Sequence, residues 1–176
     1  MTLRDATLVR IHVPVTAETL ATMLNGIGAA AERDPVLAQI LAVIREDNPL
    51  GDFGLYKGVF ELSPGWEGFR PGPDAQPTLG KPGDATLSPT VIVSVHAPCP
   101  PKDPAFVAAL ERIMAIHPWE VPVVEISSVR LAVRYSPLTA VSVQTFLNRT
   151  SSPQRRRGPR FVAAYSKISG IPAFAG

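Results

Sequence analysis

The sequence predicts an α+β domain, because segments in which apolar residues recur at every second position alternate with segments that carry an apolar stripe of helical spacing. Residues 7–13 and 90–96 follow the strand pattern, with Val9, Ile11 and Val13 in the first and Val91, Val93 and Val95 in the second. Hydrophobic residues make up 45% of the 176, enough for one core of ordinary size. The order of elements is that of a ferredoxin-like βαββαβ unit with one extra helix.

Three helices are predicted, each from a capping residue at its N-terminus and the apolar stripe that follows. Thr, or Asp followed by Pro, stands where a helix N-cap is expected, and an apolar stripe follows each time. The expected helices run from Ala17 to about Gly26 after Thr16, from Asp34 to Asn48, and from Asp103 to His117.

The middle of the chain is rich in Gly and Pro, and the whole sequence holds 19 prolines, about twice the ordinary share. Residues 51–87 predict a strand from about Leu55 to Leu62, followed by a long ordered loop. Trp66 and Phe69 lie in this loop, and a disordered linker rarely needs such apolar anchors. A last strand of the domain is expected at residues 121–135, which are rich in valine and isoleucine.

We expect a domain at residues 1–137 and a C-terminal extension at 138–176 that packs on the domain or on a neighbouring subunit. Within the extension, residues 138–147 predict a short helix or strand and residues 161–165 predict a strand. The basic run Arg155–Arg157 is typical of a solvated loop, with contact to phosphate or to an acidic partner as the alternative.

Charge and composition exclude several classes of function. The 17 Lys and Arg against 15 Asp and Glu argue against broad nucleic-acid binding. No apolar run approaches the ~20 residues of a membrane span, and the first residues lack a signal-peptide pattern, so we expect a cytoplasmic protein. The single cysteine, Cys99, excludes an internal disulfide and is expected to be an inert loop residue. No dinucleotide or phosphate-loop signature is present, so no organic cofactor is expected.

Three short segments resemble those of known families. They are His117-Pro118-Trp119-Glu120-Val121-Pro122, Gly65-Trp66-Glu67-Gly68-Phe69-Arg70-Pro71 with Ala75-Gln76-Pro77 and Gly80, and Gly54-Leu55-Tyr56. In this order and spacing they resemble the inserted domain of YqfO-like (NGG-interacting factor three) proteins, and the first also resembles CutA-like divalent-cation-tolerance proteins. The resemblance covers about residues 7–134. It implies the ferredoxin-like fold and a tendency to form homotrimers with pockets at subunit interfaces.

The sequence also departs from that family. We expect it to be the inserted domain alone, without the flanking domains in which full-length YqfO-like proteins hold metal ions. Gly58 stands near the position of a family histidine, and the tail after about Pro137 has no recognised counterpart. The metal-dependent hydrolase activity claimed for that family therefore does not carry over.

His117 and Glu120 form the leading candidate site. Imidazole titrates near pH ~6.5 and carboxylate near ~4.3, so a His beside a Glu suits proton transfer or gives two ligands to a divalent metal. The structural alternative is that His117 caps the C-terminus of its helix, where cations are favoured, while Trp119 is a packing residue.

A second candidate is a metal site shared by His12 and His96, which lie on neighbouring predicted strands. Glu61, Glu120 or Glu125 would complete it. No local ligand spacing supports this site, so it depends on the register of the sheet.

A third group comprises Tyr56, Trp66, Phe69 and Arg70. Aromatic walls with one guanidinium suit an apolar, anionic small molecule, and the alternative is that the loop covers the open face of the sheet.

Together these patterns predict a protein that binds a small ligand or metal ion in a pocket at a subunit interface. The residues expected to line this pocket are Tyr56, Trp66, Phe69, Arg70, His117, Trp119 and Glu120. The alternative is a cofactor-independent isomerase, cyclase or lyase in which His117 is the base, Glu120 orients it, and Tyr56 or Arg70 stabilises an oxyanion. A protein-interaction module that uses the basic tail is a third class.

Overall fold

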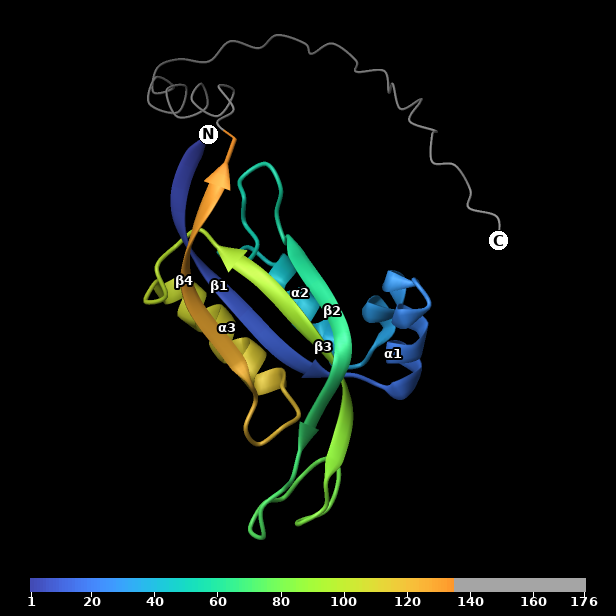
Figure 1. The fold of residues 1–176 in the computed structure, drawn as a ribbon. Coiled ribbons are helices and arrows are strands. Elements are labelled where there is room, and N and C mark those ends of the chain that lie inside the picture. Colours follow the sequence, from blue (N-terminus) through green and yellow to red (C-terminus); the bar gives the residue numbers. More distant parts are fainter. Residues whose placement is uncertain (135–176) are drawn as a thin grey trace, which may run out of the picture. The chain divides into compact units, whose positions relative to one another are not determined.

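A computed structural model of the chain describes residues 1–134. They form one antiparallel sheet of four strands, with helices against it (Figure 1). In chain order the elements are β1 (Thr2–Pro14), α1 (Ala17–Leu24), the 3-10 helix η1 (Gly28–Arg33), α2 (Leu37–Arg45), β2 (Phe60–Phe69), β3 (Thr86–Ala97), α3 (Pro104–Ile116) and β4 (Val124–Val133). The predicted extension at 138–176, with its helix or strand, its last strand and its arginine run, lies outside the described residues.

The strand order β2-β3-β1-β4 confirms the predicted ferredoxin-like class. β1 and β3 are central, and every neighbouring pair of strands is antiparallel. Register along β1 places Ile11 opposite Val93 of β3 and Val9 opposite Ile126 of β4. Each strand therefore presents alternate residues to the two faces of the sheet.

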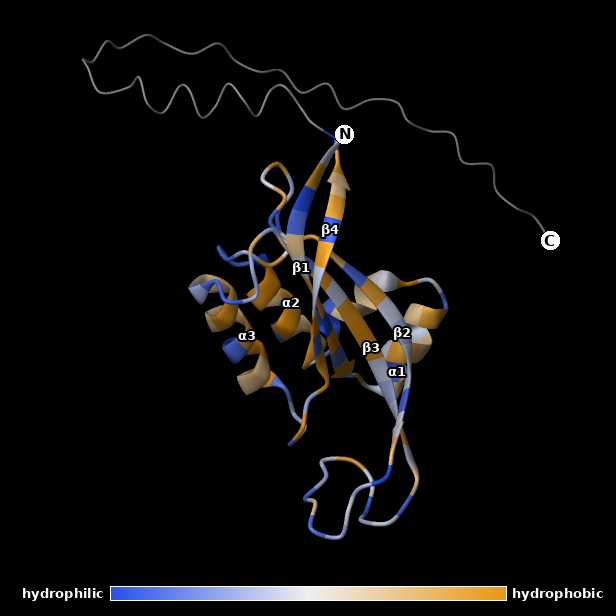
Figure 2. Cartoon of the chain, turned by 60° about the vertical axis from the view of Figure 1, so that its left-hand side comes forward, coloured by the Kyte–Doolittle hydropathy of each residue, from blue (hydrophilic) through white to orange (hydrophobic). Residues whose placement is uncertain are grey.

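One face of the sheet is buried against the helices. α2 and α3 lie on the same side of the sheet, and apolar colour marks α2 and β3 in Figure 2. The fully buried residues of this core include Val9, Ile11, Val13, Val91, Val93 and Val95 from the strands and Leu37, Ile40, Ile44, Phe106 and Ile113 from the helices. None of the helices of residues 1–134 is long and apolar enough to cross a membrane.

The predicted caps start the helices. The Thr16 hydroxyl accepts a hydrogen bond from the backbone N–H of Thr19 at 3.0 Å. Asp34 is buried, and its Oδ1 accepts from Val36 N and Leu37 N, both at 3.1 Å, while its Oδ2 accepts from Thr16 N at 3.0 Å. One carboxylate thus fixes the starts of two helices, because it satisfies backbone donors that have no partner within the helix.

The predicted strand at 55–62 and the loop after it are wrong in their bounds. β2 continues to Phe69, because its ladder with β3 runs through Pro64 opposite Val91 and on to the end of the strand. β2 is an edge strand, where the missing N–H of proline costs no ladder bond. Trp66 and Phe69 are therefore strand residues, and the loop is confined to residues 70–85.

The face of the sheet turned away from α2 and α3 is called the open face below. By register it carries Arg10 and His12 of β1, Ser94 and His96 of β3, Glu61 and Glu67 of β2, and Glu125 of β4. Many of its side chains are ionisable, in contrast to the valine-rich buried face.

Candidate functional site

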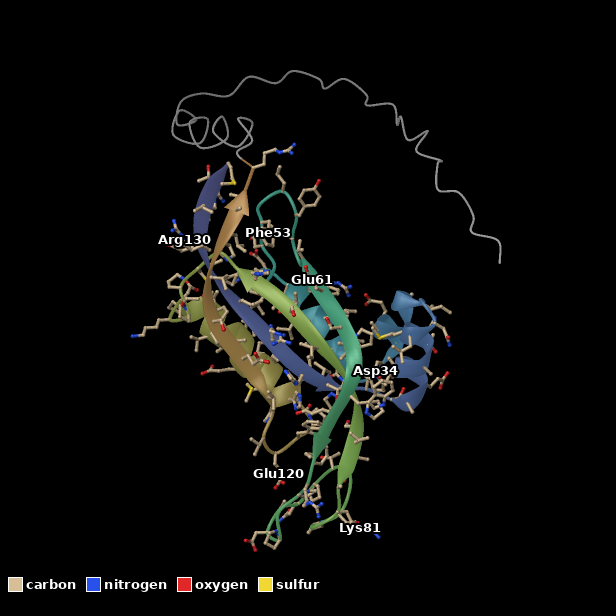
Figure 3. The ribbon with its side chains drawn as sticks, in the orientation of Figure 1. Asp34, Phe53, Glu61, Lys81, Glu120 and Arg130 are labelled. Atoms are coloured by element: carbon tan, nitrogen blue, oxygen red, sulfur yellow. The ribbon has the colours of Figure 1, made fainter. Side chains whose placement is uncertain are left out.

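A cavity of about 260 Å³ lies where the end of β2 and the loop 70–85 meet the turn 117–123 between α3 and β4. Figure 3 shows Glu120 of that turn next to the projecting β2–β3 hairpin. The cavity is lined by Glu67, Phe69, Pro71, Ala75, Pro77, Thr78, Leu79, Trp119, Glu120, Val121 and Val123. Most of these side chains are apolar, which suits a small organic ligand.

Hydrogen bonds fix the loop wall of the cavity to the turn. The backbone N–H of Gln76 donates to Glu120 Oε2 at 3.0 Å, and the Thr78 hydroxyl donates to the carbonyl of Pro118 at 2.9 Å. Gly80 allows the loop to return to β3, because its φ is +85° and a Cβ there would lie 2.3 Å from the Thr86 hydroxyl.

Two aromatic rings are in contact at the cavity. The ring centroids of Phe69 and Trp119 are 5.3 Å apart with an interplanar angle of 61°, an edge-to-face pair. Strand alternation puts Phe69 on the same face of β2 as Glu67, two residues earlier. The cavity therefore joins an aromatic wall to a carboxylate.

His117 is buried behind this turn, with 7% of its surface exposed. Its Nε2 donates to the carbonyl of His12 at 2.8 Å, and its Nδ1 accepts from the backbone N–H of Trp119 at 3.3 Å. Burial lowers the pKa of His117, opposed by the bond to the His12 carbonyl and by the charge of Glu67. The ring is neutral and both its nitrogens are occupied, so it fixes the turn.

The predicted acid–base pair of His117 and Glu120 is not formed in this arrangement. His117 is not among the lining residues, and the Glu120 carboxylate accepts from Gln76 instead. The structural alternative fits better: His117 is the C-cap of α3, its N–H donating to the carbonyl of Ile113 at 3.1 Å, and Trp119 packs on its ring.

Next to the cavity, the open face carries a row of ionisable groups. His12 Nε2 donates to Glu125 Oε1 at 3.0 Å, and Arg10 Nη1 lies 3.1 Å from Glu125 Oε2. The bond from His12, followed by the charge of Arg10, lowers the pKa of Glu125. The other ring nitrogen of His12 lies 3.8 Å from Glu67 Oε2, too far for a hydrogen bond.

The structure separates the two histidines of the predicted metal site. His96 pairs with Leu8 while His12 pairs with Ile92, so they lie four residues apart along the ladder, a distance of about 13 Å. In the part of the chain that is described, no group of three or more His, Cys, Asp or Glu residues is placed to hold a metal ion. The expected approach of the two rings is therefore wrong.

The predicted aromatic group also separates, and only Phe69 lies at the cavity. Tyr56 is 73% exposed, and its carbonyl accepts from Phe53 N, which Figure 3 places far from Glu120. Trp66 points to the opposite face of β2 from Phe69 and is 61% exposed. Arg70 donates to the carbonyl of Gly83 at 2.5 Å and braces the loop. The guanidinium expected to bind an anionic ligand is therefore not part of the cavity.

Sequence reasoning missed Glu67, Leu79 and the valines of the turn as lining residues. Glu67 was detectable in principle, because a strand that includes Phe69 places the residue two positions earlier on the same face. The Gly and Pro residues of this stretch hid the strand.

The chain matches solved proteins of two groups. A Bacillus cereus protein related to NIF3 superposes with a TM-score of 0.46 at 14% identity, over 73% of this chain and 27% of that one. The chain thus spans about a quarter of that protein's length. The CutA1 divalent cation tolerance protein from Thermus thermophilus gives 0.36 at 18% identity, over 78% and 92%. CutA1 from Oryza sativa gives 0.33 at 14% identity, over 86% and 100%. No family model and no curated protein matches the sequence.

Proposed function

We propose that this chain binds a small molecule with a flat apolar body in the cavity lined by Phe69 and Trp119. The observation that carries the proposal is the cavity itself, whose walls combine this aromatic pair with aliphatic side chains. Its volume of about 260 Å³ lies near the lower end of ligand pockets, which favours a ligand built around one ring.

Hydrogen bonds within the chain hold the walls of the cavity in place. The loop is held to the turn by Gln76 and Thr78, and the turn is held to β1 by the bond from His117 to the His12 carbonyl. A preformed site avoids part of the entropy of ordering that binding otherwise requires. We therefore assign ligand binding to this cavity between the end of β2 and the turn 117–123.

The geometry of the site does not place His117 as a catalytic base. The titratable groups that line the cavity are Glu67 and Glu120, and the nearby imidazole of His117 has both nitrogens bonded to backbone atoms. A general base needs a free lone pair within reach of its substrate. The predicted isomerase, cyclase or lyase chemistry, with His117 as the base and Glu120 orienting it, thus gains no support from the geometry.

The cavity lies within a single chain, so ligand binding does not require the predicted homotrimer. The trimer and a pocket at its interfaces stay predictions of the sequence. Sedimentation of the full chain measures the oligomeric state directly, and a monomer would still leave the cavity intact.

The binding test uses the two tryptophans, of which Trp119 lines the cavity and Trp66 faces away from it. In a Trp66→Phe protein the indole N–H of Trp119 gives one distinct NMR signal. Titration with 2-phenylethanol, a neutral single-ring probe, is expected to shift that signal with millimolar saturation, since a ligand of this size gains roughly 3–5 kcal/mol.

Two variants make the test specific. Phe69→Ala removes one wall and should weaken binding several-fold. Leu87→Ala removes an exposed apolar side chain of the same hairpin that does not line the cavity, and should leave binding unchanged. A Trp119 signal that does not saturate, or an equal response of Trp66 in a Trp119→Phe protein, would contradict the proposal.

A further inference from the structure

The charge of the cavity points to the chemistry of its ligand. Two carboxylates, Glu67 and Glu120, line it, and the lining includes no lysine, arginine or histidine. Arg10 on the open face and Arg70 next to Phe69 have other partners, since Arg10 pairs with Glu125 and Arg70 with the carbonyl of Gly83. The cavity is therefore negative as well as apolar, which favours a cationic guest.

Glu67 is the carboxylate that lacks a partner. Its Oε2 is buried, and no donor of residues 1–134 lies within hydrogen-bond distance of it. The nearest basic atom is His12 Nδ1 at 3.8 Å, on a ring whose other nitrogen is bonded to Glu125. Leaving a buried carboxylate oxygen without a donor is unfavourable. An ammonium group bound in the cavity beside the Glu67 carboxylate would lower that cost.

Glu120 differs from Glu67 in this respect. Its Oε2 already accepts from the backbone N–H of Gln76, and the residue is exposed. Glu120 therefore holds the loop and adds negative charge at the cavity, whereas Glu67 is the group available to pair directly with a ligand.

The aromatic walls also favour a cationic ligand. The faces of Phe69 and Trp119 are electron-rich, and a cation near such faces is attracted to them. A divalent metal fits less well, because no third ligating side chain of the described residues joins the two carboxylates.

We infer that the ligand is an organic amine, with its ammonium group paired to Glu67 and its apolar body against the wall formed by Phe69 and Trp119. This inference depends on the proposed binding function. It also reverses the expectation of an anionic ligand, which rested on Arg70.

The experiment compares three probes with the same ring and similar length on the Trp66→Phe full chain: 2-phenylethylamine, 2-phenylethanol and 3-phenylpropionate. The indole signal of Trp119 reports binding of each. At low salt the amine should bind about tenfold more tightly than the alcohol, as expected for one charge-assisted hydrogen bond, and the carboxylate should bind most weakly.

Glu67→Gln keeps the shape of the side chain and removes its charge. This change should reduce amine affinity to that of the alcohol while alcohol binding, which reports that the cavity is intact, stays the same. Glu61→Gln is the matched control, because Glu61 lies on the same face of β2 but does not line the cavity, and it should preserve the preference for the amine. Should Glu67→Gln lose both probes, Glu67→Asp, which keeps the charge, must retain the preference.

The outcomes separate the two claims. If the alcohol binds and the amine is no tighter, the amine inference fails and the binding function stands. If Glu120→Gln removes the preference and Glu67→Gln does not, the assignment to Glu67 is wrong. If none of the three probes binds, the proposed function itself fails, and the inference fails with it.

Discussion

Replacing His117 with alanine tests whether this residue fixes the turn of the cavity or serves as a catalytic base. The substitution removes two hydrogen bonds, to the His12 carbonyl and from Trp119 N, each with a net worth of about 1 kcal/mol. It also removes an edge contact with the Trp119 ring, at 5.8 Å between centroids, worth about 1 kcal/mol. We expect the free energy of unfolding to fall by about 3 kcal/mol, measured by urea denaturation.

The pH dependence of this loss gives a second measurement. Burial lowers the pKa of His117 in the folded state, so below about pH 6.5 the unfolded chain binds more protons than the folded one. The contribution of this neutral ring is fully present above that value and declines as the pH falls toward the folded-state pKa. The stability difference between the wild-type chain and His117→Ala should therefore be smaller at about pH 5 than at about pH 7.5.

His96→Ala is the matched control for His117→Ala. The described ring contact of His96 is an edge approach to Phe53 with 6.5 Å between centroids, so we expect a loss of about 1 kcal/mol or less. A His117→Ala variant as stable as wild type, or one whose deficit grows on acidification, would refute the structural role assigned to this ring.

Three further predictions concern the frame around the site. Asp34→Ala should lower the free energy of unfolding by about 2–3 kcal/mol in urea denaturation, because it leaves three backbone donors without their acceptor, and Asp34→Asn should lose less; equal losses would contradict this account. Gly80→Ala should weaken 2-phenylethanol binding more than Gly83→Ala, since both have positive φ but only at Gly80 would a Cβ collide with a side chain; equal effects in the NMR titration would show that the collision is relieved. Burial, followed by the charge of Asp103, raises the pKa of Cys99, so its thiol should react with an aromatic disulfide reagent more slowly in the folded than in the urea-unfolded chain at neutral pH, and equal rates would contradict the prediction.

The parts of the fold that the sequence predicted well are those set by local chemistry. Thr16 and Asp103 cap their helices as expected, and the valines of β1 and β3 form the buried face. Such features follow from side chains within a few residues of each other. The bounds of β2 depend instead on its ladder with β3, a long-range pairing that overrides the local preferences of Pro64 and its neighbouring glycines.

The site was predicted less well for a related reason. Phe69, Trp119 and Glu120 were selected for their chemistry, and the structure brings all three to the cavity. The roles expected of His117 and Arg70 gain no support. His117 is bonded to the backbone carbonyl of His12 in a distant strand, and Arg70 to that of Gly83 across its own loop, contacts that no residue pattern reveals. Trp66 and Phe69 were expected at one site because they lie close together in the sequence. They are three residues apart on β2, and an odd spacing on a strand places two side chains on opposite faces.

His12 connects these observations, because its backbone and side chain act on different parts of the same site. The carbonyl of His12 holds His117, and through it the turn that carries Trp119. Its ring is bonded to Glu125 and remains 3.8 Å from Glu67, so one cavity carboxylate stays without a close partner. A protein donor at Glu67 Oε2 would pair with this carboxylate from within the protein and remove the reason to bind a cation. The preference proposed for an amine therefore depends on Glu125, which lies outside the cavity, because it holds the His12 ring in this position.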